Sequence, residues 1–101
     1  MNFGQQIVEQ YGQEYIFRQL AEESAELTQA ALKIVRVMRD ETPVRWREAQ
    51  DHLLEEIADV WIMTDMLAED VLTQEARFKI EAIRAEKEKR MRERMLEQDG
   101  T

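Results

Sequence analysis

The sequence predicts an all-α fold, because its composition, its scarcity of helix breakers and the spacing of its apolar residues all favour helices. Glu, Ala, Leu, Arg, Gln and Met are abundant, whereas the 101 residues include only three Gly and one Pro. The first group favours helices and the second interrupts them. Apolar residues recur at steps of three, four and seven, which is the spacing of one helix face. We therefore expect an antiparallel helical bundle forming a single domain over residues 1–101.

The first expected elements are a short helix and a long one. Gly4 and Gly12 bracket residues 5–11, which are expected to form one or two helical turns. Residues 13–39 contain no Gly or Pro and should form a long amphipathic helix that ends near Asp40. Its apolar stripe consists of Ile16, Leu20, Leu27, Ala31, Ile34 and Met38.

A second long helix is expected after Pro43. Proline disfavours the helical conformation at Thr42 but suits a first helical turn, so Thr42 is the predicted N-cap. The helix should run from Pro43 or Val44 to about Glu69. Its apolar stripe consists of Leu53, Ile57, Val60, Thr64, Leu67 and Val71. Because the connection between the two long helices is short, they should pack antiparallel.

The last expected helix covers residues 73–97 and closes at Gly100. Its first part carries three large apolar residues, Phe78, Ile80 and Ile83. Residues 84–97 are almost entirely charged and are expected to be solvated. The apolar faces together exceed what a three-helix monomer of this size can cover. We therefore predict that oligomerisation completes the bundle, as a homodimer or homotetramer.

Composition excludes several classes of function. Without cysteine there is no disulfide framework, thiolate zinc site or cysteine nucleophile, and cytoplasmic localisation is the expectation. The formal net charge of -8 argues against nucleic acid as a partner, since that binding relies on a basic surface. No apolar stretch approaches the roughly 20 residues that span a bilayer, so no membrane association is expected.

Four carboxylates lie within the apolar stripes rather than opposite them. Glu23 and Glu26 interrupt the stripe of the first long helix, and Glu56 and Asp59 interrupt that of the second. Burying carboxylates together costs desolvation and mutual repulsion, so such a cluster needs a counter-charge. Neither stripe offers Lys or Arg nearby. Fully charged oxygen ligands suit a hard cation such as Mg²⁺ or Mn²⁺, which antiparallel helices would share.

Glu22 and Glu55 extend the two clusters, because each directly precedes an inner glutamate. We treat both as candidate catalytic residues. Three roles are open to them: an outer ligand, a base that orients water, or surface charge.

Written out, the clusters are Glu-Glu-Ser-Ala-Glu at 22–26 and Glu-Glu-Ile-Ala-Asp at 55–59. In these motifs the chain resembles the MazG-like, all-α nucleoside triphosphate pyrophosphohydrolases. The resemblance covers roughly residues 17–66, and residues 78–90 loosely. The 29 residues from 27 to 55 lie at the long end of the family's spacing, which should lengthen the helices or their connection.

The resemblance implies Mg²⁺-dependent hydrolysis of a nucleoside triphosphate to the monophosphate and pyrophosphate, with Mn²⁺ as a substitute ion. It also implies assembly as dimers or tetramers. The resemblance also implies that Lys79 contacts the phosphates, with Arg84 as the second candidate. Surface ion pairing is an equal alternative for both residues. The implied metal ligands are Glu23, Glu26, Glu56 and Asp59.

Two other classes of protein compete with this interpretation. A di-iron carboxylate bundle needs Glu-x-x-His pairs. The only histidine, His52, follows Ala49 by three residues, so that class fails, and His52 is expected to be exposed or packed. The second alternative is a non-enzymatic oligomerisation or adaptor protein, whose acids bind Arg or Lys of a partner. Such a protein should be indifferent to Mg²⁺ and inert towards triphosphates.

Overall fold

The computed structural model describes residues 1–100 and is all-α, as predicted, with no strand in that range. The chain divides into two compact units, one ending at Val71 and one beginning at Leu72. The helices are α1 (Phe3–Tyr11), α2 (Gln13–Met38) and α3 (Trp46–Asp70) in the first unit and α4 (Gln74–Gly100) in the second.

The short helix α1 confirms the prediction for residues 5–11 and begins two residues earlier. A capping box starts it: the Gln5 amide donates to Asn2 Oδ1 at 2.7 Å, and the Asn2 amide donates to Gln5 Oε1 at 3.0 Å. Gly12 separates α1 from α2 at φ 86° and ψ 166°. Only glycine adopts this conformation without strain, so Gly12 allows the chain to change direction there.

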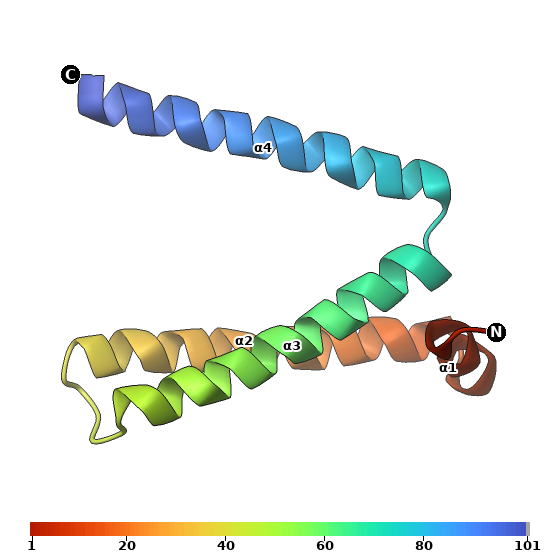
Figure 1. Ribbon diagram of the computed structural model, residues 1–101, viewed down its shortest axis with the longest axis horizontal. Helices are drawn as coiled ribbons and strands as arrows, with labels where there is room; N and C mark the ends of the chain where they lie inside the picture. Colours follow the sequence, from red (N-terminus) through yellow and green to blue (C-terminus); the bar gives the residue numbers. More distant parts are fainter. Residues whose placement is uncertain (101) are drawn as a thin grey trace. The chain divides into compact units, whose positions relative to one another are not determined.

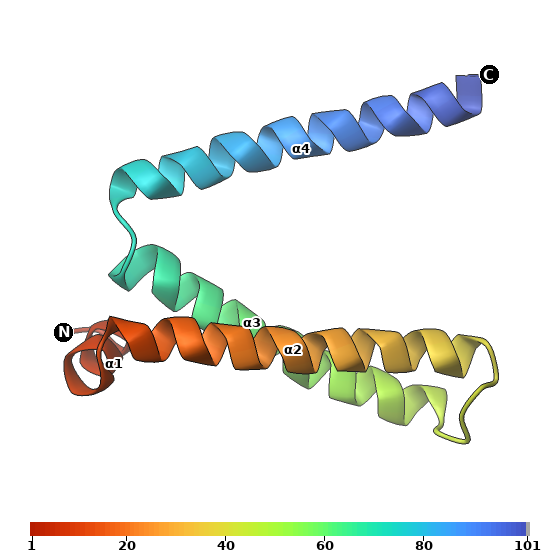
Figure 2. The ribbon, with the colours of Figure 1, turned by 180° about the vertical axis from the view of Figure 1, so that it is seen from behind.

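Helices α2 and α3 lie side by side and run antiparallel, as both views show (Figures 1 and 2). Two backbone hydrogen bonds close the C-terminal end of α2. The Glu41 amide donates to the Arg36 carbonyl at 2.9 Å, and the Asp40 amide to the Val37 carbonyl at 3.1 Å. With Asp40 at φ 55°, this is a Schellman motif, which ends α2 where the sequence predicts.

The predicted start of the next helix is wrong. Helix α3 begins at Trp46 with Arg45 as its N-cap, and both Thr42 and Pro43 lie in the connection. The Thr42 hydroxyl oxygen accepts a hydrogen bond from the Val44 amide at 3.4 Å and so closes a turn there. The fixed φ of proline suits a turn as well as the first residue of a helix. Pro43 alone therefore does not determine whether this segment forms a turn or a helix start.

The core of the first unit differs from the predicted stripes. The stripe residues Ile16 and Ile34 are buried, but Ala31 and Met38 are exposed, and Ala30 is buried instead. On α3, Ala49 and Met66 are buried and the stripe residue Thr64 is exposed. Where two long helices pack, the residues in contact recur every seven positions. A stripe of apolar residues chosen by the 3.6-residue period of a single helix therefore departs from this contact line along the helix.

The second unit is the single helix α4. The Thr73 hydroxyl oxygen caps it by accepting a hydrogen bond from the Ala76 amide at 3.1 Å. Ion pairs between residues four apart support the helix, among them Arg84 with Glu88 at 3.0 Å. Residues 84–97 are all exposed, as the charged sequence predicts. The apolar residues Phe78, Ile80 and Ile83 before them are exposed as well. Across residues 1–100, no helix is both long enough and apolar enough to cross a membrane.

Candidate metal centre

Two glutamates occupy positions of the helix contact that should be apolar. Glu23 lies seven residues after Ile16 and seven before Ala30, and Glu56 lies seven residues after Ala49. These three apolar neighbours are 0%, 1% and 1% exposed, respectively. The small side chains of both alanines permit close approach of the helix backbones. The seven-residue spacing therefore directs both glutamates into the contact between α2 and α3.

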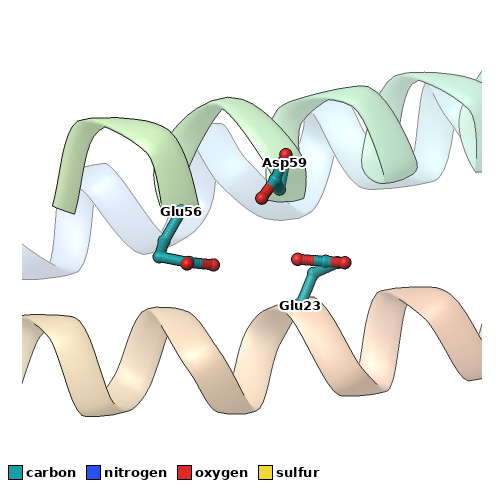
Figure 3. A group of neighbouring side chains, drawn as sticks. All are labelled: Glu23, Glu56 and Asp59. Atoms are coloured by element: carbon teal, nitrogen blue, oxygen red, sulfur yellow. The ribbon is translucent and has the colours of Figure 1, made fainter. Parts of the chain in front are cut away.

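Three carboxylates converge between these helices. Glu23 projects from α2 towards α3, while Glu56 and Asp59 extend from α3 (Figure 3). One oxygen atom from each of the three lies within 4.8 Å of the others. We call Glu23, Glu56 and Asp59 the acidic triad. The expected convergence of carboxylates from the two long helices is thus present for three of the four predicted ligands.

The acidic triad is unusually short of partners. Glu56 is only 8% exposed, and the Oε2 atoms of both Glu23 and Glu56 are buried without a hydrogen-bond partner among residues 1–100. Within the same range, the structure pairs no Lys or Arg with any member of the triad. Buried polar atoms are nearly always hydrogen-bonded, so two unpartnered carboxylate oxygens in one cluster make this a group of side chains that could hold a cation.

The electrostatics of the site penalise negative charge. Burial raises the pKa of Glu23 above its ordinary value of 4.5, and the negative charges of Glu26, Asp59 and Glu56 raise it further. Burial is likewise the largest cause that raises the pKa of Glu56. The charge of Glu26, a hydrogen bond with Glu26 and the charge of Asp59 raise this pKa further, and His52 lowers it. A hydrogen bond between two carboxyls requires that one be protonated. Without a cation, burial and mutual repulsion therefore disfavour the ionised forms of Glu23 and Glu56.

His52 contacts the acidic triad from the preceding turn of α3. Its Nε2 atom lies 3.2 Å from Glu56 Oε1, and its side chain is 43% exposed. Sequence analysis missed this contact. The signal was available, because residues four apart on a helix face one another. His52 thus contacts one oxygen of Glu56, while the other oxygen has no hydrogen-bond partner among residues 1–100.

The remaining predicted acids lie at the margin of the site. Glu26 is exposed and is not part of the triad, yet it is close enough to raise the pKa of both Glu23 and Glu56. Glu22 and Glu55 are exposed, and Gln19 Nε2 donates to Glu22 Oε2 at 3.4 Å. Each directly precedes an inner glutamate, so it is turned about 100° away from the helix contact. Their catalytic roles stay predictions.

The two predicted phosphate contacts, Lys79 and Arg84, lie on α4 in the second unit. Both are exposed and take part in ion pairs within their own helix. Lys79 Nζ lies 3.6 Å from Glu75 Oε1, and Arg84 Nε lies 3.0 Å from Glu88 Oε1. These contacts are the surface ion pairing named above as the alternative. A role in binding phosphate stays a prediction for both residues.

The donor set determines which ligands suit the site. Carboxylate oxygens are hard ligands, which select divalent cations such as Mg²⁺, Mn²⁺ and Ca²⁺ over softer metals. Such an ion would partner the free oxygens of Glu23 and Glu56 and offset the repulsion that raises their pKa values. Compared with protein-family models, curated proteins and solved structures, the chain gives no match.

Proposed function

We propose that this protein is a Mg²⁺-dependent nucleoside triphosphate pyrophosphohydrolase that cleaves ribo- or deoxyribonucleoside triphosphates to the monophosphate and pyrophosphate. The observation that supports it most is the acidic triad between α2 and α3, whose Glu23 and Glu56 each keep a buried carboxylate oxygen without a hydrogen-bond partner. The choice of reaction comes from the resemblance of the two acidic motifs to those of MazG-like enzymes. Assembly as a homodimer or homotetramer and cytoplasmic localisation belong to the same proposal.

Glu23, Glu56 and Asp59 would hold the metal, with Glu26 as a further ligand at the exposed edge. A bound divalent ion supplies positive charge that neutralises phosphate oxygens and makes water a better nucleophile near neutral pH. Mn²⁺ could take the place of Mg²⁺, because both accept oxygen ligands. The negative charge of the four carboxylates makes direct binding of a triphosphate unfavourable, so substrate binding should require the ion.

The protein's own groups would position and deprotonate the reactants. Glu22 and Glu55 are exposed beside the site, where either could accept a proton from the attacking water. His52 contacts Glu56 and would hold that carboxylate in the orientation that binds the ion. Lys79 and Arg84 stay candidates for phosphate contact. No covalent intermediate is needed, because water attacks the phosphorus directly.

A panel of canonical and modified nucleoside triphosphates tests the proposal. Each is incubated with the protein and Mg²⁺, and pyrophosphate and orthophosphate are measured separately. We expect pyrophosphate as the first product and no turnover in EDTA. Orthophosphate alone would place the protein in another class of hydrolase. No turnover of any triphosphate, together with no effect of Mg²⁺ on thermal stability, would favour the adaptor alternative.

A further inference from the structure

Helix α3 carries an exposed face that combines apolar and acidic side chains. Trp61 is 69% exposed, and Leu54 and Ile62 are exposed on the same side of the helix. From residue 51 to its end, α3 contains no Lys or Arg. We call these exposed residues the α3 face: Asp51, Leu54, Glu55, Ala58, Trp61, Ile62, Asp65 and Glu69. A large exposed aromatic residue among other apolar residues favours contact with another protein surface.

Helix α4 carries a face of the opposite charge. It holds eight of the 14 Lys and Arg residues of the chain. At 100° per residue, the acidic residues between positions 80 and 95 all fall outside one sector of about 140°. We call the exposed residues of that sector the α4 face: Ile80, Ile83, Arg84, Lys87, Arg90, Met91, Arg94 and Met95. Four of them line a single hollow, which places them side by side: Lys87, Arg90, Met91 and Arg94.

The α4 face has charge and apolar surface to offer a partner. Arg84 and Arg90 each form an ion pair with a glutamate of their own helix. Lys87 and Arg94 form none within the part of the chain that the structure describes. A helix by itself gains little stability in water, so the apolar residues of this face favour packing against another surface.

The two faces match in charge, apolar content and length. Each mixes large apolar side chains with charges of one sign, which are negative on the α3 face and positive on the α4 face. The α3 face extends over about 27 Å of helix and the α4 face over about 22 Å. Arg and Lys can also lie over the ring of an exposed tryptophan such as Trp61. Opposite charges direct which surfaces meet, whereas two α3 faces would oppose acid to acid.

The connection between α3 and α4 favours a partner in a second copy of the chain. The reversal between α2 and α3 uses seven residues, among them Asp40 at φ 55°. The connection after α3 has only three residues, none of which has a positive φ. Hydrogen bonds of the two helices extend to Val71 and Thr73, so only Leu72 lies between them. Such a short connection favours exchange of a helix between chains over reversal within one chain.

We propose that the α4 face of one copy packs along the α3 face of a second copy, and that this exchange is reciprocal. A two-fold symmetric homodimer then contains the same contact twice. The inference rests on the proposed function only for the expectation that the chain assembles, and it names the surfaces that meet. It does not depend on hydrolysis of a triphosphate.

Analytical ultracentrifugation of charge-reversed variants tests the proposal. The α4 variant combines Lys87→Glu with Arg94→Glu, and the α3 variant combines Asp65→Arg with Glu69→Arg. We expect wild type to be a dimer at micromolar concentration and each variant to raise the dimer Kd about a hundredfold or more, because like charges then oppose each other.

The matched control combines Lys89→Glu with Arg92→Glu, which makes the same change of charge on α4 outside the α4 face. Its Kd should stay within about threefold of wild type, since exposed charges away from a contact are screened. Circular dichroism establishes that each variant keeps its helices. Lys87→Gln with Arg94→Gln repeats the test should the α4 variant lose helix.

Mixing the α3 and α4 variants separates a second copy from the chain's own α4. With one variant fluorescently labelled, we expect a heterodimer about as tight as the wild-type dimer, because each reversed face meets the other. Packing of α4 within its own chain predicts no heterodimer. The proposal is overturned by a monomeric wild type, by no heterodimer on mixing, or by equal weakening in the control.

The outcomes also distinguish this proposal from the proposed function. If reversal weakens the dimer and mixing restores it, but no triphosphate is hydrolysed, the interface holds and the enzyme assignment fails. If wild type is monomeric at a concentration where it releases pyrophosphate, the enzyme assignment holds and the interface fails.

Discussion

Replacing Glu56 with glutamine separates a metal site from an ordinary ion-pair network. In the metal-free protein, burial and the charges of Glu26 and Asp59 act against the ionised Glu56, and only His52 favours it. Glu56→Gln removes the charge and keeps the shape. The metal-free variant should therefore melt at the wild-type temperature or above it. An ion-pair network predicts the opposite sign, because loss of one partner leaves the other charge buried and unpaired.

The size of the expected change in Tm follows from the linkage between ion binding and folding. At an ion concentration one hundred times its Kd, binding stabilises the folded wild type by about 2.7 kcal/mol. For a unit the size of residues 1–71, each kcal/mol shifts the Tm by roughly 4–8 °C, so Mg²⁺ should raise it by about 10–20 °C. Loss of one triad ligand should weaken the ion about a hundredfold, comparable to the largest effects of disturbing groups around a metal. At the same Mg²⁺ concentration, the variant should then gain only about 2–3 °C.

The assay is a set of thermal melts in EDTA and in Mg²⁺ for wild type, Glu56→Gln and a matched control. Asp51→Asn is that control, because it makes the same carboxylate-to-amide change at an exposed position of α3. The control should gain as much from Mg²⁺ as wild type does. Turnover of Glu56→Gln should fall about a hundredfold or more. The reasoning is refuted if the variant melts well below wild type in EDTA while wild type gains nothing from Mg²⁺.

Two further predictions concern pH and His52. Glu23 and Glu56 have pKa values above the ordinary 4.5, so metal-free wild type should lose Tm relative to Glu56→Gln as pH rises from about 4.5 through the raised values. Melts in EDTA across that range check the sign, and a relative gain with rising pH would contradict it. His52→Ala should weaken Mg²⁺ binding about tenfold, because it removes a group that orients a ligand. The Tm measured as a function of Mg²⁺ concentration gives this affinity. His52→Gln should restore part of the affinity. An unchanged midpoint of the Mg²⁺ titration in His52→Ala would exclude a positioning role for His52.

Local sequence determined most of the secondary structure. Helix breakers at Gly12 and in the segment that holds Pro43 divide the chain, and the long intervals without Gly or Pro became α2 and α4 nearly as predicted. The misplaced start of α3 shows the limit of such signals. Thr42 and Pro43 carry a sequence typical of a helix start, but the connection that follows the Schellman motif uses them in a turn.

The sequence also indicated which carboxylates to examine, because residues three apart share a face of a helix whatever surrounds it. Tertiary structure decided which of them meet. The antiparallel contact of α2 and α3 follows the seven-residue positions of Ile16 and Ala30, and so Glu56 is buried and Glu23 half-buried while Glu26 stays exposed. Burial and convergence are properties of two helices together, and neither helix encodes them alone.

The same reason explains what sequence analysis missed. The contact of His52 with Glu56 lies within one helix and was within reach of the four-residue rule. A pocket between the two helices was not, because it depends on His52 of α3 lying beside Lys33 and Arg36 of α2. Residues 33 and 52 are neighbours only because the chain reverses after Asp40 and the two helices then pack in one register. The sequence by itself determined the helices and the acidic motifs, and packing determined the triad and the pocket.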